Sequence, residues 1–422
     1  MCHFDLKNFF SPMHVILAAL FCLFAACSEE SDPEINLLPD SGVRFTLFPN
    51  DEAVNDSIAA NLAHGVKLQL HPNASYELSF DRSGAEKAPV LQLYRLYEQT
   101  ETQFKVHKVR ELEGEFVGDR IVYRFVCEEN EMIYWATSLL DGETFYRGPT
   151  KNVKLTGEGA YSDHMSINLV AVGKILPTKD SVDVDSLANL MLKDFRRYYS
   201  TIKVDTLYVR YAHEHPTLGK KYPADEPWRA GYSSDDMYLS ELGGWPEANL
   251  RNALDIVYMH RIEEEGSLGF AALFSGNMGG GKRSTVIVGN RIYAPSLGGE
   301  VPLTSKEIVE SALHETGHFF GLRHTTTTPG DWEAEGDYSN LEDGIEETPY
   351  CINLILGGYM SVNDDEIGGV ARKYYFDAKA FEIEDCPDAS NVMFPAATEL
   401  PYEGFSQKQL EIVRKNLMIF PH

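Results

Sequence analysis

One stretch of the sequence is decisive for the fold: His314-Glu315-Thr316-Gly317-His318-Phe319-Phe320-Gly321-Leu322-Arg323-His324. On a helix, residues four apart project from one face, so His314 and His318 can occupy two corners of a tetrahedral zinc site. Gly321 lets the chain turn back sharply, because glycine adopts a positive φ at low energetic cost. This turn is predicted to bring His324 to the same metal as the third ligand.

The helix that carries these residues has clear start and end signals. Thr304 and Glu307 have the spacing of a capping box, in which the two side chains satisfy the helix start. Gly321 suits the left-handed position just past a helix end. Inside the helix, Gly317 costs about 1 kcal/mol relative to alanine. We therefore expect another part of the chain to approach closely at Gly317, as the floor beneath the metal.

Glu315 is expected to be the catalytic base and not a ligand. A carboxylate next to the first histidine can face the open coordination position and take a proton from an activated water. A structural zinc site is closed by four protein ligands and would not need this carboxylate. The sequence therefore predicts one catalytic Zn²⁺ held by His314, His318 and His324.

The eleven residues match in full the long zinc-binding consensus of the metzincin metallopeptidases, and the chain resembles this family. The resemblance implies an α+β zincin domain with a mixed twisted sheet, an active-site helix, a Met-turn and a C-terminal helix. It also implies a zinc-dependent endopeptidase that hydrolyses peptide bonds of extracellular proteins or peptides. Ser390-Asn391-Val392-Met393-Phe394-Pro395 is similar to the family's methionine turn, which makes Met393 the expected floor residue, although a core methionine is the alternative.

Within the metzincins the chain is most similar to the pappalysin-like group. Leu268-Gly269-Phe270-Ala271 and the run from Ser284 to Val288 are similar to its edge strand and the next strand. Gly336-Asp337-Tyr338 and Glu347-Thr348-Pro349 are similar to its segment after the helix. Pro395 stands where many members have a tyrosine, and the Met-x-Pro form is similar to adamalysins and matrixins, so the subfamily stays open. An extended peptide substrate is expected to pair with the edge strand, because backbone pairing aligns any sequence.

Residues 1–26 are typical of an export signal, with an apolar stretch, Val15 to Ala26, that is too short for a comfortable membrane span. Leu23-Phe24-Ala25-Ala26-Cys27 resembles the lipobox of bacterial lipoproteins, which implies lipidation of Cys27 and anchoring in the cell envelope. The acidic run after it, Ser28 to Asp32, resembles a surface-export tag, so the expected location is the outer membrane with exposure at the surface. A plain secretory signal is the alternative.

The 422 residues leave room for more than one domain. We predict an acidic tether over 27–41, a β-sandwich-like domain over 42–160 and the catalytic domain over 161–422. The sandwich is predicted from short alternating runs between turn residues: Val43 to Leu47, Lys67 to Leu70, Tyr76 to Phe80, Val90 to Tyr97, Arg120 to Cys127 and Met132 to Thr137. The pattern then changes to strand, helix and strand, with the helix at Asp185 to Tyr199, which implies a parallel pair.

The formal charge of −27 opposes binding to nucleic acid and to anionic lipid. Gly276 to Lys282 has the glycine and lysine offsets of a phosphate loop, but Arg283 stands where a serine or threonine would hold magnesium, so no nucleotide site is expected. A monomer with a protein or peptide substrate is the expected state.

Three cysteines remain beyond the signal and Cys27. Cys127 shares a strand face with Ile121 and Tyr123, which favours a buried thiol, with a zinc-blocking role in a latent form as the alternative. By elimination, Cys351 and Cys386 are expected to form a disulfide in an oxidising compartment.

Two further groups have more than one interpretation. His213-Glu214-His215 could be a metal pair, but on a strand both histidines lie over solvent as readily. An acidic segment could ligate calcium or form a solvated face: Glu333, Glu335, Asp337, Glu342, Asp343, Glu346 and Glu347. For the whole chain, the alternative function is a surface binding or adhesion lipoprotein in which the zinc domain is vestigial.

Overall fold

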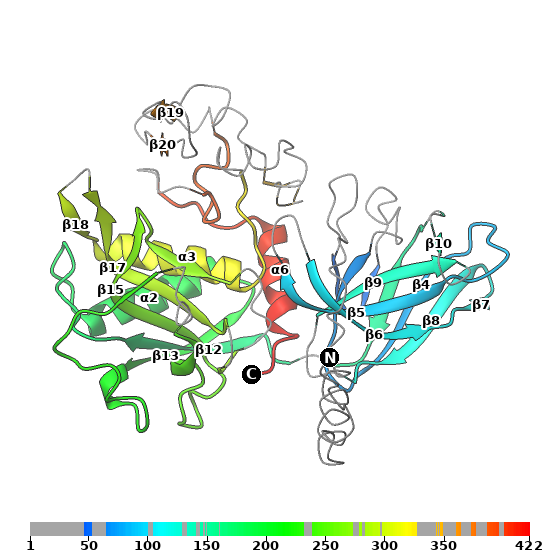
Figure 1. Cartoon of the computed structure of the whole chain (residues 1–422), viewed down its shortest axis with the longest axis horizontal. Helices are drawn as coiled ribbons and strands as arrows, with labels where there is room; N and C mark the ends of the chain where they lie inside the picture. Colours follow the sequence, from blue (N-terminus) through cyan, green and yellow to red (C-terminus); the bar gives the residue numbers. More distant parts are fainter. Residues whose placement is uncertain are drawn as a thin grey trace, which may run out of the picture.

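The computed structural model describes residues 46–52, 65–99, 104–128, 133–140, 144–146, 148, 150–159, 161–231, 239–272, 278–280, 283–295, 298–326, 343, 345, 347–348, 360–363, 373–376, 386–395 and 401–422. These residues form many strands and few helices, so the general α+β class is confirmed. Figure 1 shows the strands of the N-terminal part apart from the sheet that carries α2 and α3. Within the described ranges, no helix is long and apolar enough to cross a membrane.

The first eleven strands form two sheets. One has the order β1-β3-β9-β5-β6, with β10 paired to β9, and the other has the order β2-β11-β4-β8-β7. Their bounds are β1 (Thr46–Leu47), β2 (Asp51–Glu52), β3 (Val66–Gln69), β4 (Ser75–Asp81), β5 (Val90–Gln99), β6 (Phe104–Leu112), β7 (Glu115–Val117), β8 (Arg120–Val126), β9 (Ile133–Leu140), β10 (Thr144–Phe145) and β11 (Lys154–Gly157).

Side chains from both of these sheets are buried in one hydrophobic cluster. Leu68 and Leu93 come from one sheet, and Leu78 and Phe80 from the other. Cys127 belongs to the same cluster and is 1% exposed, so the buried thiol is confirmed. Two sheets with a shared core agree with a sandwich, while the boundaries 42–160 stay a prediction.

The third sheet carries the decisive helix. Its order is β13-β12-β15-β17-β16, with β14 paired to β15 and β18 paired to β17. The strands β12, β13, β15 and β17 run parallel, as the strand–helix–strand pattern predicts, whereas β16 and β18 run antiparallel to β17. The bounds are β12 (His164–Ala171), β13 (Lys203–Tyr211), β14 (Arg229–Ala230), β15 (Leu254–Glu265), β16 (Gly269–Ala271), β17 (Thr285–Ala294) and β18 (Gly299–Pro302).

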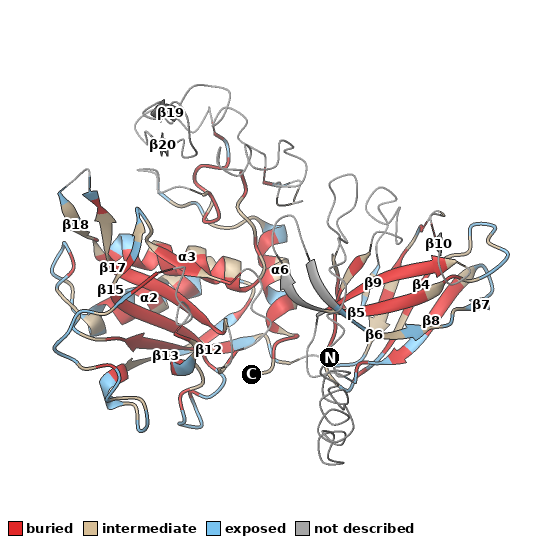
Figure 2. Ribbon diagram, in the orientation of Figure 1, coloured by how far each residue is buried: buried red, intermediate tan, exposed pale blue. Residues whose placement is uncertain are grey.

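Two helices, α2 (Val184–Tyr198) and α3 (Ser305–Phe319), pack on one face of the third sheet. Figure 2 shows the strands between β12 and β17 buried along most of their length. The Tyr199 hydroxyl, just past α2, donates to the Leu313 carbonyl of α3 at 2.6 Å. The remaining elements are the 3₁₀ helices η2 (Ala212–Glu214) and η3 (Ser240–Leu242), the strands β19 (Met360–Asn363) and β20 (Lys373–Phe376), and the helix α6 (Gln407–Leu417).

The C-terminal helix α6 connects the N-terminal sheets to α3. Its Lys415 pairs with Asp51 at 2.5 Å and lies over the ring of Phe48. The next residue, Asn416, donates from its amide nitrogen to the carbonyl of Phe320 at the end of α3. Figure 1 shows α6 between the two parts of the chain. A capping box formed by Ser406 and Gln409 starts α6.

Some predicted elements differ from the observed ones. His213 was expected on a strand, but it lies in the 3₁₀ helix η2, because β13 ends at Tyr211 and the chain turns there. The edge strand predicted to start at Leu268 is the shorter β16. The strands β6 and β11 were not predicted, because charged residues interrupt the alternation of β6 and β11 is only four residues long.

The third sheet also contains a buried acid, Asp255. Its carboxylate accepts hydrogen bonds from the Asn168 side chain and the Gly244 backbone, both at 2.8 Å. Burial nonetheless raises the pKa of Asp255 from 3.8 to about 7, with these hydrogen bonds opposing the shift. The folded chain therefore keeps a proton that the unfolded chain releases over this range.

This difference predicts that the stability falls as the pH rises from about 4 to about 7, because the folded state binds more protons than the unfolded state there. The Asp255→Asn variant should not show this part of the pH dependence. The unfolding free energy of the wild type relative to the variant should fall by up to about 4 kcal/mol across that range. Chemical denaturation at several pH values measures it. Parallel pH profiles for the two proteins would contradict the assignment.

Candidate metal centre

The helix α3 is buried on every side except along one line of residues. Lys306, Glu310, His314 and His318 follow one another at intervals of four, and each is at least partly accessible, as is Glu307 at the start of the helix. The other positions from Ile308 to Phe319 are buried. Because residues four apart lie on one face, the two histidines point out of the core along this open line.

The three predicted histidine ligands lie together. The Nε2 atom of His324 is 3.2 Å from that of His314 and 3.1 Å from that of His318. Zinc binds histidine nitrogen at about 2.0 to 2.1 Å, so two ligands of a tetrahedral site lie roughly 3.3 Å apart. Within the described part of the chain, this group is a set of three ligand atoms that could hold one metal ion.

The hydrogen bonds of two rings determine which nitrogen faces the centre. His314 uses Nδ1 toward the Val392 carbonyl at 2.7 Å, and His318 uses Nδ1 toward the Leu322 carbonyl at 2.8 Å. A carbonyl can only accept, so Nδ1 carries the proton in both rings and Nε2 presents a lone pair. Convergent lone pairs repel one another, whereas a cation between them is stabilised. The arrangement therefore fits a divalent metal.

Burial also favours neutral imidazoles. It lowers the pKa of His314, lowers that of His318 to about 3 with a further contribution from His314, and holds that of His324 well below its usual value. Neutral imidazole is the form that ligates metal. The three rings are thus ready to bind a cation at neutral pH.

The turn after α3 brings His324 into place as predicted. Gly321 has a φ of +88°, which is the left-handed region. Its N–H donates to the His318 carbonyl and the N–H of Leu322 donates to the Gly317 carbonyl, at 2.8 and 2.9 Å. These two bonds make a Schellman motif, which ends the helix and reverses the chain.

Met393 lies directly beneath Gly317. A Cβ on Gly317 would collide with the sulfur of Met393. Met393 is fully buried, and its backbone N–H donates to the side-chain oxygen of Asn391 at 2.8 Å. The predicted close approach at Gly317 is therefore present, and the methionine segment is the part of the chain that makes it.

Glu315 faces the edge strand β16. A Cβ on Gly269 of that strand would be 2.8 Å from Cγ of Glu315, so glycine is needed for the two to pack. Burial raises the pKa of Glu315 to about 8, and a backbone hydrogen bond from Ala271 opposes the shift. The position of the Glu315 side chain therefore depends on its packing against β16.

The sequence did not indicate the contacts that hold the segment after His324. The backbone N–H of Thr325 donates to the Met393 carbonyl at 3.1 Å, and its hydroxyl donates to buried Asp388 at 2.6 Å. Asn391 donates from its side chain to Gln409 of α6 at 2.9 Å. Asp388 lies in a polar stretch that looks like any loop. Only its position five residues before Met393 could have marked it.

The structure describes one of the two cysteines that were predicted to form a disulfide. Cys386 is fully buried and disulfide-bonded. Its proposed partner Cys351 lies outside the described residues, as does the lipid-anchor candidate Cys27. The pairing of Cys351 with Cys386 stays a prediction.

The other candidate groups are partly described. His215 accepts from the backbone of Thr217 and Leu218 through Nδ1, which uses that nitrogen locally. Asp343 accepts from Ile345 and Thr348, and Glu347 accepts from the Lys408 backbone. The other acids of the calcium candidate lie outside the described residues: Glu333, Glu335, Asp337, Glu342 and Glu346.

Comparisons with known proteins add no family. No family profile matches the chain, and no curated protein matches it. Among solved structures, an acetyl xylan esterase (Est2A) from the rumen bacterium Butyrivibrio proteoclasticus is aligned at 9% identity and a TM-score of 0.10, over 67% of this chain and 75% of that chain. A TM-score this low carries no argument about fold or function.

The contact between Gly317 and Met393 predicts whether an alanine at position 317 stabilises or destabilises the protein. In an ordinary helix interior, glycine to alanine stabilises by about 1 kcal/mol. Here Gly317→Ala should destabilise by roughly 1 to 3 kcal/mol, because the new methyl group overpacks the site against the sulfur. Denaturant unfolding of the two proteins measures the difference. A more stable variant would show that the two segments do not meet as described.

Proposed function

We propose that the protein is a zinc-dependent endopeptidase of the metzincin type. One observation carries the proposal: the Nε2 atom of His324 lies 3.2 Å from that of His314 and 3.1 Å from that of His318, close to the spacing of a tetrahedral site, and Glu315 is the residue next to His314. The catalytic domain would accordingly have the zincin fold, with Met393 in a Met-turn. The parallel strands, the antiparallel edge strand β16 and the Met393 floor support it.

His314, His318 and His324 would hold Zn²⁺, which supplies Lewis acidity that activates water and polarises a carbonyl. The protein's own acid–base step belongs to Glu315. Its carboxylate takes a proton as water attacks the peptide carbonyl, and it then delivers that proton to the leaving amine. The packing of Glu315 against Gly269 keeps the carboxylate in a fixed position for both transfers.

The substrate would lie in an extended conformation along β16. Among the described strands of its sheet, β16 is the last in the order, and it pairs with β17. A peptide that added to β16 as a further strand would be aligned by its backbone, whatever its side chains. Because Ala271 of β16 also hydrogen-bonds to Glu315, a peptide on this edge lies next to the catalytic base.

The catalytic role of Glu315 is tested by Glu315→Gln. This variant should bind one zinc per chain and lose turnover of an unfolded protein substrate by several orders of magnitude, because only the base is removed. Metal analysis and a peptide-release assay measure the two properties. Near-wild-type cleavage would exclude Glu315 as the base.

The matched control is His324→Ala, which should lose both zinc and activity, since a ligand is removed. Chelation of the wild type should have the same effect on activity. A wild type that binds zinc and cleaves no protein or peptide would favour the alternative, a surface binding protein with a vestigial zinc domain.

The proposed location is the cell envelope, through a lipid on Cys27. The lipobox-like sequence before Cys27 supports it. In cells, the wild type should fractionate with membranes, and Cys27→Ser should release the protein into the soluble fraction because its anchor is lost. Immunoblots of the fractions and the mass of the N-terminal peptide measure this. A wild type that is soluble and has no lipid mass would contradict the anchor.

A further inference from the structure

A cavity lies at one end of the third sheet, and it shares no lining residue with the metal centre. It has a volume of about 400 Å³. Its walls come from the loop between β12 and α2, from the end of β13 with η2, and from Tyr258 of β15. This volume is within the range of small-molecule and side-chain binding sites.

The cavity lies where the chain direction diverges. After β12 the chain passes to α2, which packs in the cluster on the α3 face of the sheet. After β13 the chain passes to Ala212, which packs in the cluster on the opposite face. Loops that leave adjacent parallel strands toward opposite faces open a crevice at the carboxyl ends of the strands, which is the preferred place for a ligand in such sheets.

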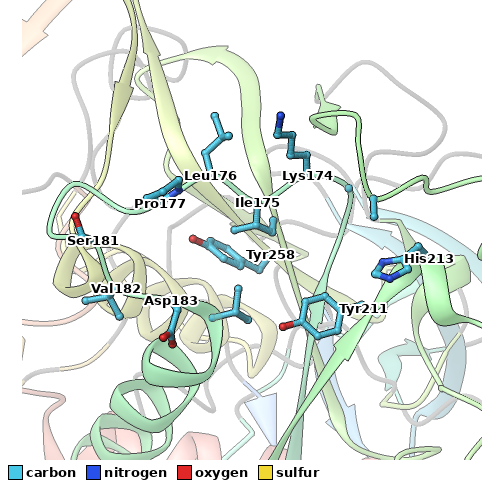
Figure 3. A pocket seen from close by; sticks show the side chains of 13 residues that line it. Lys174, Ile175, Leu176, Pro177, Ser181, Val182, Asp183, Tyr211, His213 and Tyr258 are labelled. Atoms are coloured by element: carbon cyan, nitrogen blue, oxygen red, sulfur yellow. The ribbon is translucent and has the colours of Figure 1, made fainter.

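The lining combines apolar walls with a carboxylate. Ile175, Val182 and Val184 supply aliphatic surface, and Tyr211 and Tyr258 supply aromatic surface. Figure 3 shows Asp183 at the lower rim, with the Tyr211 hydroxyl pointing toward the same side. An extended stem can therefore lie against the apolar walls while its end reaches the acid.

The charge at the Asp183 end of the cavity favours a cation. Asp183 is the N-cap of α2 and is held there by the Ser186 N–H at 2.7 Å, so an acid already occupies the helix end where an anion would bind. Burial raises the pKa of Tyr211, and the carboxylates of Asp185, Glu214 and Asp183 raise it further. Lys174 also lines the cavity, and Figure 3 places it on the other side of Ile175 from Asp183. A positive nitrogen near Asp183 and Tyr211 is thus attracted by the acids and by the aromatic ring.

We propose that this cavity binds a ligand with a positively charged nitrogen on an apolar stem, as in the side chain of lysine or arginine or in a small aliphatic amine. The stem lies between Val184, Tyr211 and Tyr258, and the nitrogen pairs with Asp183. The formal charge of −27 raises the local concentration of such cations. The site does not depend on the proposed peptidase activity.

Binding is tested with three probes: n-butylammonium, Nα-acetyl-lysine N-methylamide and its neutral norleucine analogue. Titration of the full chain by ligand-observed NMR should show saturable binding of a charged probe in the millimolar range or tighter, and weaker binding of the neutral analogue. Equal binding of the two charged probes indicates a free amine as the ligand. Binding of the capped lysine alone indicates a side chain of a polypeptide.

Substitutions in the lining test whether the ligand binds in this cavity. Asp183→Asn should weaken binding roughly tenfold and keep α2, because asparagine caps a helix as well as aspartate does. Ala224→Phe should block the cavity through bulk alone. Glu86→Gln is the control, since it removes the same charge at an exposed position away from the lining. The proposal is overturned if no charged probe binds, if the norleucine analogue binds equally well, or if Asp183→Asn and Glu86→Gln behave alike.

Discussion

The contact between the sulfur of Met393 and the backbone of Gly317 is the constraint on which the metal centre depends. It holds the methionine segment so close to α3 that a methyl group on Gly317 would force the buried Met393 side chain to shift. With the segment at this distance, the Val392 carbonyl reaches Nδ1 of His314, and the Met393 carbonyl reaches the N–H of Thr325. One packing contact therefore orients the first histidine and positions the residue that follows the third.

The same contact explains why the C-terminal helix belongs to the site. Gln409 of α6 accepts a hydrogen bond from Asn391, two residues before Met393, and Asn416 donates one to the carbonyl of Phe320 at the end of α3. Lys415, between them on α6, contacts Phe48 and Asp51 of the N-terminal part. A continuous set of contacts thus runs from the N-terminal sheets through α6 to the metal centre. A change in the packing of α6 is therefore expected to alter the geometry of the metal centre.

The metal ligands were easier to predict from the sequence than the residues that hold them in place, because the ligand motif is local in the sequence. The spacing of His314, His318 and His324, together with Gly321, indicates the ligand geometry directly, and Gly317 indicates a close approach. The partners that hold this geometry are distant in sequence. Asp388 and Asn416 are ordinary polar residues until the fold buries them, so no pattern marks them. Periodicity predicted the strand–helix–strand unit and the edge strand of the third sheet but not its short strands β14 and β18, and its strand order depends on tertiary packing that periodicity does not contain.

The central claim is that three imidazoles of this chain hold one zinc ion and leave a position for water. X-ray absorption spectroscopy of the zinc-loaded wild type tests it most directly. The account predicts three histidine nitrogens at about 2.0 to 2.1 Å and one oxygen ligand. A spectrum with sulfur in the coordination shell, or with fewer than three imidazoles, would contradict it.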